Sequence, residues 1–555
     1  MKTEKTKRIL ISLLFFLTIN EINTFKCGAD KLKIKPKHLN STKEIEKRRL
    51  DQEYTPIKIG IDFTPFEKPS SLSNQDFQKA KNLITETMDE FKKFLYIEHE
   101  DINLDSNDIQ DIMSGCEVDK VSRDYRNFLI NNDLIVFPYF DNSLGSGILA
   151  AAGACITIGN NRPRPVFGIL FINPELSFNI DNSDLYMKNL LLHEVTHILV
   201  FNPDLFNQLG MVNDSGTQII SSKALLKARQ HFNCDSLSGI PLENQGGEGS
   251  VGSHWEARYM LGDYMISTDY IDYALSDITL ALFEDTGYYK VNYYSGGLFK
   301  YGKNKGCDFI NEKCIKNGEP ISEEFCTSSG QKMCSSSMTM KAYCVIYDYT
   351  HSSVNVPTSY QYFDNPNYGG FLPANFCPVA NAQNDEDNYY PNSCKVGTSN
   401  LSTDYGETIG DTSFCFISSL LPRDSKLNVT EQAICYEIQC DDYNKKIIVY
   451  IGSLTITCPT SGGIVNDPNG FKGSINCPKY IDICDSKDNN LCNEMFDCLS
   501  KGVETDYDSY IFDSEEENFN RIKDSGNNNN IYSISSFIKI DVIIIFFFML
   551  LTVFL

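Results

Sequence analysis

The stretch LLHEVTHILVFNP, Leu191–Pro203, is the most informative part of this sequence. It carries His193 and His197, four residues apart, with Glu194 directly after the first histidine. Residues i and i+4 lie on one face of an α-helix, so both imidazoles can reach one zinc ion about 2.0–2.1 Å away. The spacing therefore indicates a metal-binding helix.

The residues around this motif predict where the helix begins and ends. The apolar run is typical of a buried helix over Leu185–Phe201, with Asp181, Asn182 and Ser183 as candidate N-caps and Pro203 ending it. The alternative is a buried helix that contains two histidines by chance. The chain has only 7 histidines, and two unligated imidazoles in an apolar run would cost free energy, which favours metal binding.

Glu194 is the candidate catalytic residue. Zinc lowers the pKa of a bound water to about 7, and a carboxylate beside the metal can take the proton of that water during attack on a carbonyl. The same carboxylate can then protonate the leaving amine. The pattern HExxH therefore predicts peptide-bond hydrolysis.

The third metal ligand is less obvious from the sequence. The compact pattern HExxHxxGxxH fails, because Val200 stands at the glycine position and no histidine occurs where the last one would be. The other histidines are His38, His99, His231, His254 and His351. His254 stands out, because it follows the glycine-rich segment Gly246–Ser253, whose flexible backbone can approach a metal closely.

Periodicity along the rest of the chain predicts an α+β fold, and 555 residues predict two or three domains. We expect strands over Pro56–Phe63, Phe167–Ile172 and Lys445–Gly452, and helices over 75–97 and Asp277–Asp285. Beyond about residue 300, short β-like runs dominate and helical periodicity is weak.

Charge and cysteine content restrict the partners and the compartment. The formal net charge of −24 argues against nucleic acid and anionic membrane surfaces as partners. Of 19 cysteines, 15 lie between Cys307 and Cys498, which predicts a disulfide-rich region in a secreted protein. Glycosylation sequons occur at Asn40, Asn213, Asn400 and Asn428.

Both ends of the chain resemble processing signals. Residues 1–24 have the basic start and short apolar run of a signal peptide, and residues 25–50 form a basic segment that we expect to be a short propeptide. At the other end, residues 531–555 are typical of a glycosylphosphatidylinositol (GPI) anchor signal after an acidic and asparagine-rich stalk. The alternative is a transmembrane helix, which would have to bury Lys539 and Asp541.

Three ordered blocks carry a resemblance to a known family. HEVTH, then Gly239–Met265, GIPLENQGGEGSVGSHWEARYMLGDYM, then Leu275–Tyr294, LSDITLALFEDTGYYKVNYY, are similar to the leishmanolysin family of zinc metallopeptidases, of the metzincin clan. The resemblance covers roughly residues 25–500. Members have a long insertion before the third zinc histidine, and here 56 residues separate His197 from His254.

The resemblance implies the roles of the site residues. His193, His197 and His254 would bind one zinc ion, Glu194 would be the catalytic acid and base, and Met265 would lie in the turn beneath the metal. It implies a metzincin-like catalytic domain with a mixed sheet, followed by a disulfide-rich and mostly β region. The expected organisation is signal peptide 1–24, propeptide 25–50, N-terminal catalytic subdomain 51–202, insertion and third-ligand region 203–300, cysteine-rich domain 301–500, stalk 501–530 and anchor signal 531–555.

Two positions depart from the family pattern. Val200 replaces a glycine that lets the chain turn after the helix, so we expect the turn to move to Asn202 in the left-handed region. Family propeptides often carry a histidine-flanked cysteine whose thiolate caps the zinc. Here Cys27 and Asp30 match while the flanking histidines are absent, and Cys27 is either this cap or an ordinary cysteine.

These observations predict a zinc-dependent endopeptidase of the secretory pathway, held at the cell surface by its C-terminal lipid anchor or tail. Its partners would be protein or peptide substrates, lying along an edge strand near Phe167–Ile172, and the oligomeric state is not predicted. The alternative is a weakly active or inactive zinc-containing surface antigen or adhesion protein.

Overall fold

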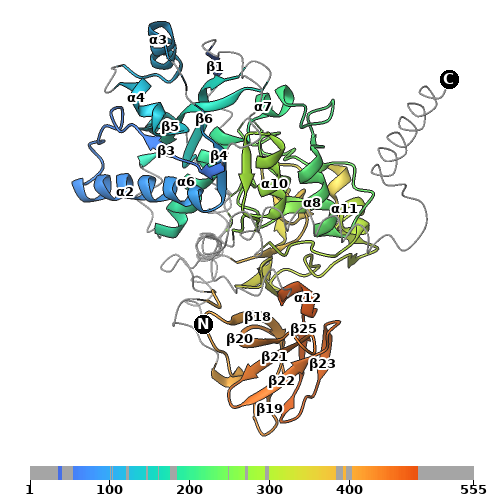
Figure 1. Cartoon of the computed structure of the whole chain (residues 1–555). Helices are drawn as coiled ribbons and strands as arrows, with labels where there is room; N and C mark the ends of the chain where they lie inside the picture. Colours follow the sequence, from blue (N-terminus) through green and yellow to red (C-terminus); the bar gives the residue numbers. More distant parts are fainter. Residues whose placement is uncertain are drawn as a thin grey trace, which may run out of the picture. The chain divides into compact units, whose positions relative to one another are not determined.

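The computed structural model describes the parts of the chain that hold the motifs (Figure 1). The described residues are 35–39, 54–100, 102, 104–119, 124–144, 148–159, 162–174, 184–247, 249–268, 270, 273–293, 299–382, 392–395 and 403–484. All described residues belong to one unit of the chain, Met1–Glu504. The expected signal peptide, stalk and anchor signal, Cys27 and the candidate N-caps Asp181, Asn182 and Ser183 lie outside the described residues.

A five-stranded sheet of order β1-β6-β7-β5-β3 supports the motif helix. Its strands are β1 (Lys37–His38), β3 (Ile59–Ile61), β5 (Leu134–Phe140), β6 (Ala150–Ile158) and β7 (Arg164–Ile172). β6 runs antiparallel to β7, and the other pairs are parallel. The predicted strand Phe167–Ile172 is therefore confirmed as part of β7. The prediction that it lies at an edge is wrong, because β5 and β6 pair with its two sides.

The two faces of this sheet bury separate apolar clusters. Leu134 and Val136 of β5 pack with α2 (Asn74–Glu90) and α6 (Asp184–Leu199) on one face. Ile135 and Phe137 pack on the other face with residues of α3 (Ser106–Gly115) and α4 (Tyr125–Ile130). Alternate side chains of a strand point to opposite faces, so α6 is placed against a sheet that is covered on both sides.

Gly168 on β7 lets α6 lie close to the sheet. A Cβ atom at this position would stand 2.5 Å from Cγ2 of Ile198 on α6. Such a contact is shorter than real Cβ atoms show, so either the helix or the strand would have to shift. The absence of a side chain at residue 168 thus sets the depth at which the motif helix packs.

Tertiary pairing changes two of the predicted elements. The expected helix over 75–97 ends at Glu90, where α2 gives way to a short turn and to β4 (Leu95–Glu98). β4 pairs on both sides, with β2 (Tyr54–Pro56) and β10 (Tyr289–Val291), so its apolar run is buried as a strand. The expected strand Pro56–Phe63 is split, because β2 and β3 belong to different sheets.

Residues 203–293 form the helices and short strands around His254. These elements are α7 (Pro203–Gln208), β8 (Gln218–Ile219), α8 (Ser222–Phe232), β9 (Ile240–Pro241), α9 (Ala257–Met260) and α10 (Asp277–Asp285). α8 and α10 pack against each other, and α10 has the bounds predicted for it. No helix among the described residues is long and apolar enough to cross a bilayer.

The described residues from Cys307 onward are built mainly from short strands. The elements are α11 (Cys307–Asn311), β11 (Ile315–Lys316), β12 (Glu319–Pro320), β13 (Lys332–Cys334), β14 (Lys341–Cys344), β15 (Tyr347–Asp348), β16 (Tyr368–Gly369), β17 (Ala380–Asn381), β18 (Ser413–Ser418), β19 (Leu421–Pro422), β20 (Gln432–Asp441), β21 (Lys446–Ile451), β22 (Leu454–Cys458), β23 (Gly463–Asn466), β24 (Phe471–Lys472), β25 (Ser474–Cys477) and α12 (Tyr480–Ile483). A six-stranded sheet has the order β22-β21-β20-β18-β25-β23 (Figure 1). The predicted strand Lys445–Gly452 is confirmed as β21.

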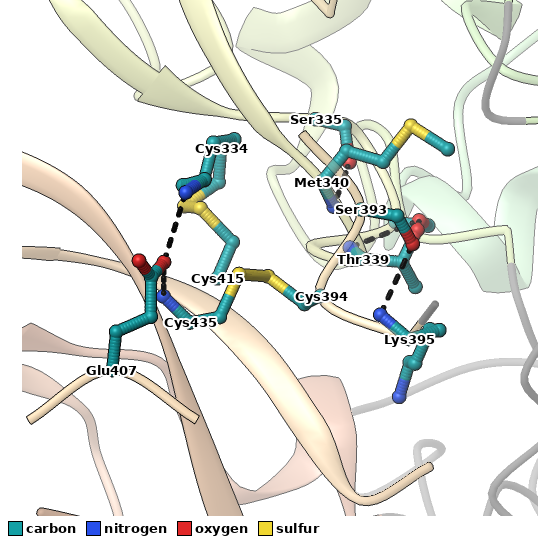
Figure 2. The surroundings of a disulfide bond; sticks show 12 residues. Cys334, Ser335, Thr339, Met340, Ser393, Cys394, Lys395, Glu407, Cys415 and Cys435 are labelled. Atoms are coloured by element: carbon teal, nitrogen blue, oxygen red, sulfur yellow. Dashed lines mark hydrogen bonds and ion pairs between the residues drawn. A yellow bond between two sulfur atoms is a disulfide. The ribbon is translucent and has the colours of Figure 1, made fainter. Parts of the chain in front are cut away.

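Disulfides join these strands. Eight are formed among the described residues, and six of them lie wholly between Cys314 and Cys484. Figure 2 shows two of them close together, Cys334–Cys415 and Cys394–Cys435, with Glu407 accepting a hydrogen bond from the Cys435 amide at 3.0 Å. The predicted mixed helix-and-sheet fold with a disulfide-rich C-terminal part is confirmed.

Candidate metal centre

Three imidazoles meet at one point. His193 and His197 come from α6, and His254 comes from the loop before α9. The Nε2 of His197 lies 3.1 Å from the Nε2 of His193 and 3.1 Å from that of His254, and the third pair is 3.2 Å apart. Three nitrogens that bind one zinc ion tetrahedrally at about 2.0–2.1 Å are about 3.3 Å apart, so the spacing suits this metal.

The other ring nitrogens determine which way these imidazoles point. The Nδ1 of His193 donates to the carbonyl of Tyr264 at 2.6 Å, that of His197 to Phe201 at 2.7 Å, and that of His254 to Ser250 at 3.1 Å. A carbonyl only accepts hydrogen bonds, so each Nδ1 carries the proton. The three Nε2 lone pairs therefore face one another, an arrangement that a cation stabilises.

Burial keeps the three rings neutral. His193 is 8% exposed, and His197 and His254 are 1% and 0% exposed. Burial lowers the pKa of His193 to about 4, although its hydrogen bond to Tyr264 opposes the shift. Burial, reinforced by the neighbouring imidazoles, holds the pKa of His197 and His254 well below the usual value. Neutral imidazole is the form that binds metal, so the cluster is ready for an ion at neutral pH.

Glu194 and Met265 are both fully buried. Glu194 follows His193 on α6, about a quarter-turn around the helix from it. Met265 lies in the same turn as Tyr264, and its carbonyl accepts the amide of Trp255, the residue after His254, at 3.0 Å. The turn that contains Met265 is thus joined directly to the segment of the third histidine.

The loop that carries His254 is shaped by glycine. Gly246, Gly247, Gly249 and Gly252 have φ values of 87°, 76°, 97° and 80°. These positive φ angles favour glycine, in line with the flexibility predicted for this segment. The Gly252 amide donates to the Glu243 carbonyl and the Glu243 amide donates to the His254 carbonyl, both at 2.9 Å. The backbone of Glu243 therefore pairs with both Gly252 and His254, and this fixes the segment that carries the third histidine.

The chain leaves α6 differently from the prediction. Asn202 is extended, with φ −138° and ψ 124°, and is not left-handed as expected. Its side chain caps α7 by accepting the amides of Asp204 at 2.9 Å and Leu205 at 3.1 Å. Val200 continues the helical hydrogen bonding, with its amide on the Thr196 carbonyl at 2.9 Å. The next helix starts at once, so no residue with positive φ is needed here.

The remaining histidines do not join the cluster. The Nδ1 of His99 lies 2.8 Å from Asp133 Oδ1, and the Nε2 of His231 lies 2.8 Å from the Tyr301 carbonyl. His38 lies on β1 beside Thr157, and His351 is exposed. Across the described ranges, His193, His197 and His254 form the one group of side chains arranged to hold a metal ion.

Sequence reasoning missed the residues that orient the ligands. Tyr264, Phe201 and Ser250 act through backbone carbonyls, which every residue type supplies. Tyr264 also offers its hydroxyl to Thr196 Oγ1, 2.9 Å away on α6. The only sequence signal for this role was that Tyr264 directly precedes Met265.

Comparisons with known proteins point to one family. The sequence model of the leishmanolysin family matches residues 83–490, which include the three histidines and Glu194. The leishmanolysin homolog of Crithidia fasciculata is 28% identical over 395 residues, 67% of this chain and 58% of that protein. Leishmanolysin of Leishmania tropica is 26% identical over 359 residues, covering 61% and 52% of the two chains.

A relative from an animal matches a shorter part. The leishmanolysin-like peptidase of Caenorhabditis briggsae is 30% identical over 310 residues, 48% of this chain and 46% of that protein. The matches thus cover about half to three-fifths of the length of these curated relatives.

Proposed function

Since the chain belongs to the leishmanolysin family, we propose that it is a zinc-dependent metalloendopeptidase that cleaves protein or peptide substrates. One observation carries the proposal: three buried Nε2 atoms converge within 3.2 Å while each Nδ1 donates to a carbonyl. The ligands would be His193, His197 and His254, with one zinc ion per chain.

The residues of the site have separate roles in the proposed reaction. Zinc held by His193, His197 and His254 would lower the pKa of a bound water to about 7. Glu194 takes a proton from the attacking water and later gives it to the leaving amine. Met265 packs beneath the ligands and makes no bond in the reaction. The buried surroundings exclude bulk water, which strengthens the electrostatic effect of Glu194.

We also propose a route to the cell surface. Eight disulfides among the described residues are typical of a protein that folds in an oxidising compartment. In this proposal residues 1–24 are a signal peptide, Cys27 of the propeptide would cap the zinc, and residues 531–555 are a lipid anchor signal.

The test compares the purified protein with its Glu194→Gln variant on a denatured protein substrate. We expect both to hold one zinc ion per chain and the variant to cleave at least about 10²-fold more slowly, because it has lost its acid and base. The matched control is Glu86→Gln, a half-exposed carboxylate paired with Lys188, which should cleave at the original rate.

The same measurements separate the alternative function. A surface antigen or adhesion protein that keeps zinc for folding would contain the metal but show no cleavage in either form. Equal cleavage rates in the original protein and Glu194→Gln would also exclude the proposed mechanism.

A further inference from the structure

Asp263 is a buried carboxylate that directly precedes Tyr264 and Met265 in the sequence. It is 0% exposed, and one oxygen accepts the amide of Met265 at 2.8 Å. The other oxygen accepts the hydroxyl of Thr279 at 2.8 Å and the amide of Ser276 at 3.3 Å. All three partners donate, so the carboxylate ties the turn at Met265 to the N-terminus of α10.

The residue next to it orients the first zinc ligand. Tyr264 gives its carbonyl to the Nδ1 of His193 at 2.6 Å and its hydroxyl to Thr196 at 2.9 Å. The amide of Tyr264 donates to the Ala274 carbonyl at 2.9 Å. The direction of this carbonyl depends on the turn between Asp263 and Met265, so a change at Asp263 reaches the ring of His193.

Asp263 also reaches the third ligand. The Thr279 hydroxyl that donates to Asp263 accepts the indole N–H of Trp255 at 2.8 Å. Trp255 directly follows His254, is fully buried, and donates its amide to the Met265 carbonyl at 3.0 Å. One carboxylate is therefore linked, through Tyr264 and through Thr279, to two ligands that are 61 residues apart.

We propose that Asp263 is a positioning residue that sets the zinc affinity of this centre, by holding His193 and His254 at their mutual distance. The inference rests on the proposed zinc site and concerns how that site is built. Partners outside the ligand shell commonly change metal affinity by about 10–100-fold when they are removed.

The main experiment is zinc competition against a chelator with the Asp263→Asn variant. The substitution keeps the shape but places an NH2 group against an N–H or O–H donor, which breaks one link. We expect the zinc dissociation constant to rise by about 10–100-fold. With cobalt(II) in place of zinc, the visible absorption spectrum of the variant should also change, because the ligand geometry has shifted.

The matched control is Asp62→Asn. Asp62 is also 0% exposed and accepts the amide and hydroxyl of Thr64, at 3.0 and 2.7 Å, and the hydroxyl of Tyr125 at 3.1 Å. Its partner Tyr125 belongs to the apolar cluster on the sheet face opposite α6. Its loss should lower stability but leave the zinc dissociation constant and the cobalt spectrum unchanged.

A second pair of variants keeps the test decisive if Asp263→Asn does not fold. Thr279→Val removes the hydroxyl that links Asp263 to Trp255 and should weaken zinc binding, whereas Thr279→Ser keeps the hydroxyl and should restore it. Equal zinc affinity in the original protein and in the Asp263 or Thr279→Val variants would overturn the positioning role. An original protein that binds no zinc would instead overturn the proposed function.

Discussion

The sheet beneath α6 and the strands after Cys307 are stabilised in different ways. Every residue of β6 and β7 is buried, and a single disulfide, Cys116–Cys155, joins this sheet to the described segment after α3. In the C-terminal sheet, β22 and β23 are mostly exposed, and Ile464 on β23 is 67% exposed. Six disulfides among its described residues cross-link that region.

The two regions therefore obtain their stability from different sources. A sheet covered on both faces removes much apolar surface from water, at about 25 cal/mol per Å². A region of short, half-exposed strands gains less from burial and is stabilised by covalent links that restrict its unfolded chain. The metal centre is built on the region that relies on packing.

The strongest test of this comparison removes one disulfide from each region. Cys394–Cys435 and Cys116–Cys155 span 41 and 39 residues, and all four cysteines are 0% exposed. Loop entropy alone predicts the same loss, about 4 kcal/mol, for either double alanine variant. We expect the C-terminal variant to become sensitive to protease after residue 307 while keeping its zinc.

The variant that lacks Cys116–Cys155 should keep both its sheet and its zinc, because the buried strands remain. Limited proteolysis with mass spectrometry and a zinc assay measure both outcomes. The comparison would be contradicted if only the Cys116–Cys155 variant lost its zinc and the C-terminal region resisted protease in both variants. That result would mean that the sheet beneath α6 is stabilised by its disulfide and not by packing.

The pH dependence of stability provides the second test, within the packed region. Burial raises the pKa of Asp263 to about 6 from an ordinary value of 3.8. The folded state thus binds this proton more tightly, so the contribution is present below pH 4 and is lost as the pH rises through 6. Between pH 4 and 7, the unfolding free energy of the metal-free protein relative to Asp263→Asn should fall by about 2.5 kcal/mol.

Denaturant unfolding at several pH values measures this difference. A difference that stays constant from pH 4 to pH 7 would mean that the folded protein does not perturb Asp263.

The third test adds a methyl group between the sheet and the motif helix. Gly168→Ala places a Cβ 2.5 Å from Ile198, so we expect a loss of about 1–3 kcal/mol and weaker zinc binding as α6 shifts. The control is Gly410→Ala in the C-terminal region, where nothing lies within 4 Å of the added atom. Thermal unfolding should show a change below about 0.5 kcal/mol for the control.

The smallest expected effect is at the exit of α6. Asn202→Ala removes the cap of α7 and should cost about 1 kcal/mol, while Asn202→Gly should cost only a few tenths. Zinc affinity should not change, because His197 is oriented by the Phe201 carbonyl. A stabilising effect of glycine would instead indicate a left-handed residue at this position.

Local patterns in the sequence located the residues of the histidine cluster and several elements of the fold. Three local patterns were informative: the spacing of His193, Glu194 and His197, the glycines before His254, and the periodicity of Asp277–Asp285. The first two led to the histidine cluster, and the third led to α10 with its correct bounds. Density of cysteine likewise predicted the cross-linked C-terminal part.

The surroundings of these residues depend on contacts between segments that are far apart in the sequence. Residues 91–97 form a turn and a strand where a helix was expected, because β2 and β10 pair with β4. β7 lies inside its sheet where an edge strand was expected, because β6 pairs with its second side. The carbonyls of Tyr264, Phe201 and Ser250 orient the ligands, and their direction depends on distant segments. Every residue has the same backbone carbonyl, so the residue type does not show which carbonyls orient the histidines. Tertiary packing determines which of them do.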